Sequence, residues 1–139
     1  MNDAQNKSQH LNMIQQIIAR MGNNSFSLKQ WSAGIIVAIY AFAGENFHKA
    51  AIVTIIPLIV FWLLDSYYLM LERKFRCLYD EVRKKEEDQI DFDMSFKNVN
   101  ISMNDFKKYC FFKVAFSKTI IPFYLVCIIT TLIIYFIEF

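Results

Sequence analysis

Glycine, proline, cysteine and histidine are all scarce in this sequence, and each scarcity argues against a class of protein. The 139 residues include three Gly, two Pro, three Cys and two His. The sequence therefore has no glycine-rich phosphate-binding loop and no paired Cys or His ligands of a zinc site. The three cysteines form no CxxC spacing, so we expect free thiols rather than a disulfide framework. We predict no catalytic residue, no metal site and no cofactor.

Neither basic nor acidic residues are in clear excess. Fifteen basic residues against 13 acidic residues leave a net charge of +2, which gives no support for nucleic-acid binding. An acidic run within residues 86–93 lacks the Gly and the terminal Glu of a calcium-binding loop. The basic clusters within residues 73–76 and 83–85 are best interpreted as topology signals, although they would also suit anionic lipid headgroups.

Apolar residues are abundant, at 55% of the chain, and 14 of the residues are Phe. They are gathered into blocks separated by polar stretches. Lipid favours this arrangement, because backbone polar groups in a bilayer must be satisfied within each segment. The sequence therefore predicts an all-α integral membrane protein, folded as one membrane domain with three transmembrane helices, an N-terminal amphipathic helix and a helical cytoplasmic extension.

Three blocks are predicted to span the membrane. The first is 28–44, where Ser27 and Gln30 have the spacing of a capping box at the helix start. The second is 50–71, and because no helix breaker follows, it should continue to about residue 85 as a cytoplasmic stalk. The third is 119–137, which is 19 residues without a charge. A cytoplasmic link, 86–118, should join the last two.

The polar parts of the chain are predicted to form a cap beneath the membrane. Residues 8–21 have the period of an amphipathic helix, and a turn at 23–25 should separate it from the first span. The stalk carries an apolar stripe that needs a cover, and the N-terminal helix is predicted to supply it. Residues 89–101 alternate like a strand, so they either form an ordered loop on the cap or pair with another chain. The candidate partner-binding residues are Phe75, Leu78, Val82, Phe92 and Phe96.

The distribution of Lys and Arg predicts the orientation. Fourteen of the 15 lie before Trp31 or in the link between the second and third spans, and one lies in the short link 45–49. Under the positive-inside rule, the N-terminus and the 72–118 link should be cytoplasmic and the C-terminus should lie on the other side.

Asp65 is the most informative single residue, because a carboxylate near a membrane is costly and often functional. It is either structural, accepting hydrogen bonds from a cap, a tyrosine or a neighbouring basic residue, or it lines an ion or gating path. Other polar residues share one face of each helix, which indicates either ordinary packing or an oligomeric conduit: Tyr68 and Glu72 on the second span, and Tyr124, Cys127, Thr131 and Tyr135 on the third. Gly34, Ala38 and Ala41 form a small-residue face for helix packing.

Several stretches look like those of short bacterial membrane proteins: 23–31 (NNSFSLKQW), 61–69 (FWLLDSYYL) and 116–119 (FSKT). The layout of an N-terminal helix, a close pair of spans and a cytoplasmic helix resembles the SLATT-type membrane effectors of bacterial anti-phage systems. The third span departs from their two-span plan. The resemblance implies a homo-oligomer in the bacterial inner membrane, with a periplasmic C-terminus, that perforates the bilayer when a soluble partner or signalling ligand engages it.

Three hypotheses for function follow. The first is a non-enzymatic effector whose cytoplasmic cap receives a signal and whose second and third spans then let ions through. The second is a membrane anchor or scaffold that recruits a soluble enzyme through the cap. A small-molecule transporter is the weakest, because three spans without an inverted repeat leave little room for a midplane site.

Overall fold

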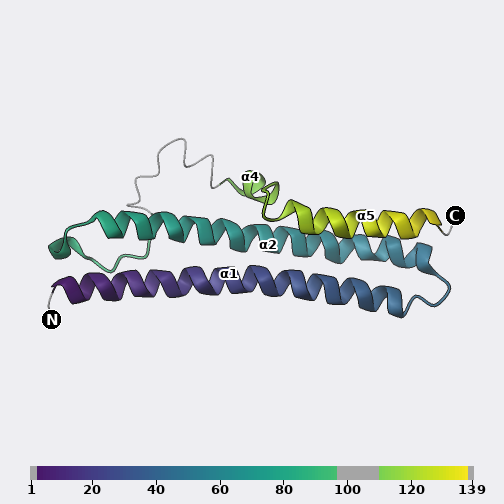
Figure 1. Cartoon of the computed structure of the whole chain (residues 1–139), viewed down its shortest axis with the longest axis horizontal. Helices are drawn as coiled ribbons and strands as arrows, with labels where there is room; N and C mark the ends of the chain where they lie inside the picture. Colours follow the sequence, from purple (N-terminus) through teal and green to yellow (C-terminus); the bar gives the residue numbers. More distant parts are fainter. Residues whose placement is uncertain (1–2, 97–109, 138–139) are drawn as a thin grey trace.

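Two very long helices form the body of the protein. The computed structural model describes residues 3–96 and 110–137, and within these ranges the structure is helical with no strand. Helix α1 (Asp3–Ala41) and helix α2 (Phe47–Lys84) run antiparallel along each other for their whole length (Figure 1). At 1.5 Å per residue each is about 57 Å long, roughly twice the thickness of a bilayer core.

A short turn joins α1 to α2. Gly44 has a φ of +58°, a left-handed conformation that side chains with a Cβ rarely adopt. The Asn46 amide donates a hydrogen bond of 3.0 Å to the Ala43 carbonyl, and this bond closes the turn. The turn thus places the second helix directly beside the first.

The predicted break between the N-terminal helix and the first span is wrong. The chain stays helical through residues 23–25, so 8–21 and 28–44 belong to one helix, α1, and Ser27 is not a cap. Asn and Ser are weak helix formers, but each costs only about 0.7 kcal/mol or less relative to Ala. Packing on α2 along the whole of α1 outweighs that local preference, and Ser25 is buried in the contact.

Helix α2 was predicted from residue 50 to about 85, and the structure has one uninterrupted helix from Phe47 to Lys84. After it come a single 3-10 turn, η1 (Glu87–Gln89), the short helix α4 (Phe111–Ala115) and the apolar helix α5 (Ile121–Ile137). Helix α5 packs against α2 and ends at the same end of the molecule as the α1–α2 turn (Figure 1).

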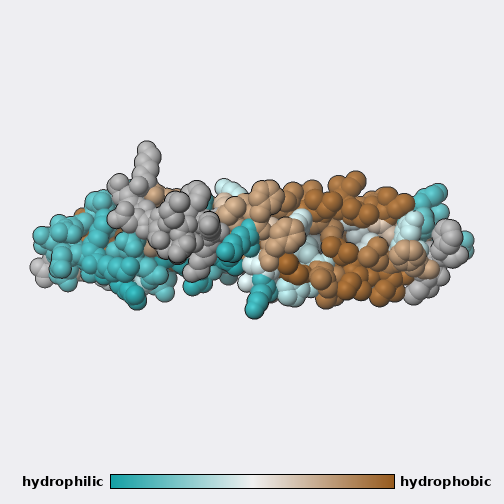
Figure 2. Space-filling model, turned by 90° about the horizontal axis from the view of Figure 1, so that it is seen from above, coloured by the Kyte–Doolittle hydropathy of each residue, from teal (hydrophilic) through white to brown (hydrophobic). Residues whose placement is uncertain are grey.

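The surface is divided into an apolar end and a polar end. Large apolar side chains are exposed on α2 from Ile52 to Tyr67 and on α5 from Leu125 to Phe136. Figure 2 shows them gathered over the end that holds α5, with hydrophilic residues over the opposite end. An exposed apolar surface of this extent marks contact with a membrane or with another protein.

Within the described residues, α2 is the one helix that is long and apolar enough to cross a membrane. Only 22% of its most apolar window is buried inside the molecule, whereas the core helix of a soluble protein would be mostly buried. Of the three predicted spans, one thus meets this criterion of length and composition. Helix α5 is apolar but has 17 residues, about 26 Å, against a bilayer core of roughly 30 Å.

The polar end has its own small core. Leu78 and Val82 of α2 are covered by Ile14 of α1, which is fully buried. Residues 90–96 lie over this core as an ordered loop rather than a strand, with Ile90, Met94 and Phe96 packed on it. The stripe on the stalk is therefore covered from both sides by the chain itself.

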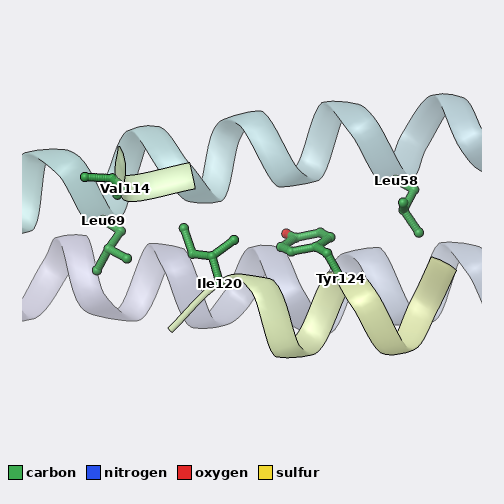
Figure 3. Close-up of a cluster of buried hydrophobic side chains, with 5 residues drawn as sticks. All are labelled: Leu58, Leu69, Val114, Ile120 and Tyr124. Atoms are coloured by element: carbon green, nitrogen blue, oxygen red, sulfur yellow. The ribbon is translucent and has the colours of Figure 1, made fainter. Parts of the chain in front are cut away.

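The second core joins α2 to α4 and α5. Figure 3 shows its buried members, which are Leu58, Leu69, Val114, Ile120 and Tyr124. Trp62 of α2 holds α4 in place through two contacts. Its indole Nε1 donates a hydrogen bond of 3.1 Å to the Ala115 carbonyl, and its ring packs edge-on against the ring of Phe116. Within the predicted cytoplasmic link, 86–118, residues 97–109 lie outside the described residues, and the part described after them contains the short helix α4.

Candidate functional site

A buried ion pair between α1 and α2 is the most distinctive site in the molecule. The Asp65 side chain is fully buried, and its Oδ2 lies 2.6 Å from Lys29 Nζ. Ser25 donates a hydrogen bond to Asp65 Oδ1, and Lys29 Nζ also donates to Ser25 Oγ at 3.0 Å. The three side chains therefore form a closed polar triangle, which we call the Lys29–Asp65 cluster.

The long helices bring these residues together by simple geometry. Ser25 and Lys29 are four residues apart, so both project from the same face of α1. Ser25 precedes the end of α1 by about as many residues as Asp65 follows the start of α2, which puts these two at nearly the same level of the hairpin. Lys29 lies one helical turn nearer the α1–α2 turn, and its long side chain reaches back to Asp65. That level is the boundary between the apolar and polar ends.

The surroundings of the carboxylate explain why the cluster exists. An unpaired buried charge would cost several kcal/mol, so a fully buried carboxylate needs an opposite charge and hydrogen bonds. The Lys29 side chain stays 19% exposed, so Lys29 is less completely removed from solvent than Asp65. Tyr124 of α5 is buried and interacts electrostatically with Asp65, which connects the third helix to the same site.

Glu72 and Tyr68, predicted to share the face of Asp65, lie outside the cluster. Glu72 accepts hydrogen bonds of 2.9 and 2.7 Å from Arg76 Nε and Nη2, one turn further along α2. Tyr68 is half-buried and meets Tyr67 edge-on. Both residues follow Asp65 toward the polar end.

The α5 residues predicted to line a conduit are spread along the apolar end. Cys127 packs against the second core, and Thr131 is buried, donating a hydrogen bond of 2.9 Å to the Cys127 carbonyl. Thr131 and Thr54 of α2 line the same groove of about 280 Å³ between the two helices. Tyr135 stacks on His48 near the α1–α2 turn, with ring centroids 4.1 Å apart.

The small-residue face of α1 points away from α2. Gly34, Ala38 and Ala41 are all exposed, and a Cβ added at Gly34 would meet no atom within 4 Å. Within this chain they make no close helix contact of the kind predicted, because α1 packs through the face that carries Ser25 and Ser32.

The predicted partner-binding residues are used inside the chain. Leu78 and Val82 are 5% and 1% exposed beneath α1 and the 90–96 loop, so a second protein could reach them only if the cap opened. Phe75 and Phe96 contact each other edge-on at 4.9 Å. Phe92 packs against His10.

His10 is a second buried polar side chain, located in the cap. Its ring is fully buried and lies 5.3 Å from the ring of Phe92, whose φ of +53° is unusual for a bulky residue. Burial lowers the pKa of His10 from its usual value, because a charged imidazolium is disfavoured there, although Asp91 and the Asp93 backbone partly oppose the shift. The loop therefore closes over a neutral histidine.

Acidification is expected to loosen this loop. The closed cap binds a proton at His10 less readily than the open cap, so its stability is fully present above pH 6.5 and falls as the pH drops below that value. Amides of residues 90–96 should exchange several-fold faster at pH 5.5 than at pH 7.5, after correction for intrinsic rates. His10→Phe should abolish this difference, and a pH response that survives the substitution would contradict the assignment.

The Asp91 carboxyl, which lies near His10, titrates below that window. Asp91 accepts a hydrogen bond from the Asp93 amide and pairs with Lys85 at 3.3 Å, and both interactions lower the pKa of the Asp91 carboxyl. On α1, Lys7 donates a hydrogen bond of 2.7 Å to the Lys85 carbonyl. A response between pH 5.5 and 6.5 would thus report His10.

Sequence reasoning identified Asp65 but missed its partners. The predicted turn at 23–25 removed Ser25 from the helix, and Lys29 was counted only as a topology signal. Pairing the two helices as a hairpin and comparing residues at equal distances from the turn would have found Ser25, and Lys29 lies one helical turn from Ser25 on the same face of α1. Comparisons with protein-family models, curated proteins and solved structures gave no match. Among the described residues, no three His, Cys, Asp or Glu side chains gather as metal ligands.

Proposed function

We propose that this chain is a non-enzymatic effector of the bacterial inner membrane that lets ions cross when its cytoplasmic cap is engaged by a partner or signal. In this proposal the apolar parts of α1, α2 and α5 all cross the bilayer, and several copies assemble. The resemblance of the layout to SLATT-type effectors supports a role in anti-phage defence. The cap and the N-terminus lie in the cytoplasm and the C-terminus in the periplasm.

The observation that carries the proposal is the position of the Lys29–Asp65 cluster. It joins α1 to α2 where the polar end meets the apolar end, and both helices continue without a break in each direction. A displacement of α1 against α2 in the cap would be transmitted along rigid helices to this ion pair. The cluster therefore has the geometry of a latch between a sensing end and a membrane end.

Polar groups buried within the apolar end also support the proposal. The hydroxyls of Ser32 and Tyr40 are buried, and neither makes a hydrogen bond within the described part of the chain. Buried polar groups without partners are rare and favour water or an alternative arrangement. If the helices separate, these hydroxyls become available to line a hydrated path.

The anchor hypothesis stays as the second candidate, because the cap offers an exposed groove with both polar and apolar side chains in its lining. The groove has a volume of about 510 Å³ and lies between the polar halves of α1 and α2, beside Gln15, Arg76 and Asp80. Ion flux through liposomes that carry the purified full chain separates the two functions. If no variant that breaks the latch conducts, and the chain instead forms a stoichiometric complex with a soluble protein, the anchor function is correct.

A further inference from the structure

A groove beside the Lys29–Asp65 cluster combines cationic and apolar surface. It has a volume of about 500 Å³ and is built by α1, α2 and the segment that leads into α5. Lys29, Arg73 and Arg76 line it together with Phe26 and Leu69. Because the groove lies where the polar and apolar ends meet, a molecule bound there would need a charged part and an apolar part.

Among the residues that the structure describes, one cation of the groove has no carboxylate partner. Lys29 is paired with Asp65, and Arg76 is paired with Glu72, which also lines the groove. Arg73 has no carboxylate partner in the described ranges, so the groove keeps a net positive charge. A guanidinium presents a planar set of N–H donors that match the oxygens of a phosphate.

The apolar part of the groove restricts the ligand further. Phe26 is 62% exposed in this surface, and Trp31, one and a half turns along α1 toward the apolar end, is 67% exposed. Exposed aromatic rings at such a level are typical of a lipid headgroup interface. Free phosphate would leave the Phe26 ring in the groove uncovered, whereas the glycerol and acyl chains of a lipid would cover it.

We propose that this groove binds the phosphate of an anionic phospholipid, with Arg73 as its main ligand and the acyl chains directed over Phe26 toward the apolar end. The inference depends on the proposed membrane placement but not on ion conduction. A lipid held there lies against Lys29, so lipid composition would act directly on the Lys29–Asp65 cluster.

Native mass spectrometry of the full chain in detergent tests the proposal, with phosphatidylglycerol, phosphatidylcholine and inorganic phosphate as probes. Arg73→Gln should reduce retention of phosphatidylglycerol about fivefold, the effect expected for one basic residue at an anionic surface. Lys74→Gln is the matched control. It removes the same charge from the next position of α2, and Lys74 does not line the groove.

Three outcomes would overturn the proposal. One is an equal loss of lipid in Arg73→Gln and Lys74→Gln, which would mean that general surface charge attracts the lipid. Another is equal retention of phosphatidylcholine and phosphatidylglycerol by the parent chain. The third is displacement of the lipid by millimolar inorganic phosphate, which would identify a free-phosphate site. Absence of ion flux would refute the proposed effector function and leave these lipid results unchanged.

Discussion

Lys29→Met is expected to destabilise the folded hairpin by about 3 kcal/mol, the typical cost of removing one partner of a buried ion pair. The substitution keeps the apolar stem of the side chain but leaves the fully buried Asp65 carboxylate without its cation. Unfolding of the purified chain by SDS in mixed micelles, followed by tryptophan fluorescence and circular dichroism, measures the loss.

Two further variants show whether the loss comes from the unpaired charge. The double variant Lys29→Met with Asp65→Asn removes both charges and should recover most of the stability, because Asn at this position can still accept a hydrogen bond from Ser25. Lys84→Met breaks an exposed pair with Glu81 and should change stability by no more than about 0.5 kcal/mol. Equal losses in Lys29→Met and Lys84→Met would show that the buried pair does not hold the helices together.

Asp65→Asn is expected to make the membrane leaky without any activating partner. The substitution is isosteric and removes the charge that holds Lys29, so the closed arrangement of α1 and α2 loses stability relative to the open one. A change of about 1.4 kcal/mol in that balance is a tenfold change in the open population. We therefore expect at least a tenfold rise in potassium efflux from liposomes, and depolarisation of cells that express the variant.

Asp80→Asn is the matched control for this experiment. It makes the same chemical change on the same helix, but Asp80 lies in the cap, where its side chain is 58% exposed and is 3.8 Å from Arg83. Efflux from this variant should equal that of the parent. If Asp65→Asn folds and inserts but its potassium efflux equals that of the parent, the Lys29–Asp65 cluster does not control ion flow and the effector proposal fails.

The predictable parts of the fold follow from long, strong patterns. The uninterrupted helix from Phe47 to Lys84 was visible because 50–71 is apolar and no breaker follows before the acidic run. The stripe of Leu78 and Val82 likewise showed that the stalk needed a cover, and α1 supplies it through Ile14. Periodicity over many residues reports burial, and burial is what determines these elements.

The predictions were wrong or incomplete where the local sequence pattern favoured one structure and contacts between distant residues favoured another. Residues 23–25 have the composition of a turn, yet Ser25 contacts Asp65, which is 40 residues away in the sequence. The alternation at 89–101 left open an ordered loop on the cap or a strand paired with another chain, and its described part, 90–96, packs on the cap as a loop. Neither contact is encoded in the local sequence, because each depends on how α1 lies against α2.

For the same reason, only one member of the Lys29–Asp65 cluster could be identified from the sequence. The cost of burying a carboxylate singled out Asp65 from composition alone, and a basic residue was among the partners considered. Identifying Lys29 required the register of the hairpin, which the turn at Gly44 sets. His10 carried no sequence signal, because its burial depends on the loop that folds over it.

The central claim is that three helices cross the membrane with the cap on the cytoplasmic side, and thiol labelling tests it most directly. In a background with Ser at the three native cysteines, single cysteines replace Asp3, Glu45, Glu86 and Phe139, and intact spheroplasts are treated with a membrane-impermeant maleimide. Glu45→Cys and Phe139→Cys should react in intact cells, and Asp3→Cys and Glu86→Cys only after permeabilisation. Labelling of Phe139→Cys only after permeabilisation would show that α5 does not cross, and labelling of Asp3→Cys in intact cells would show that α1 does not.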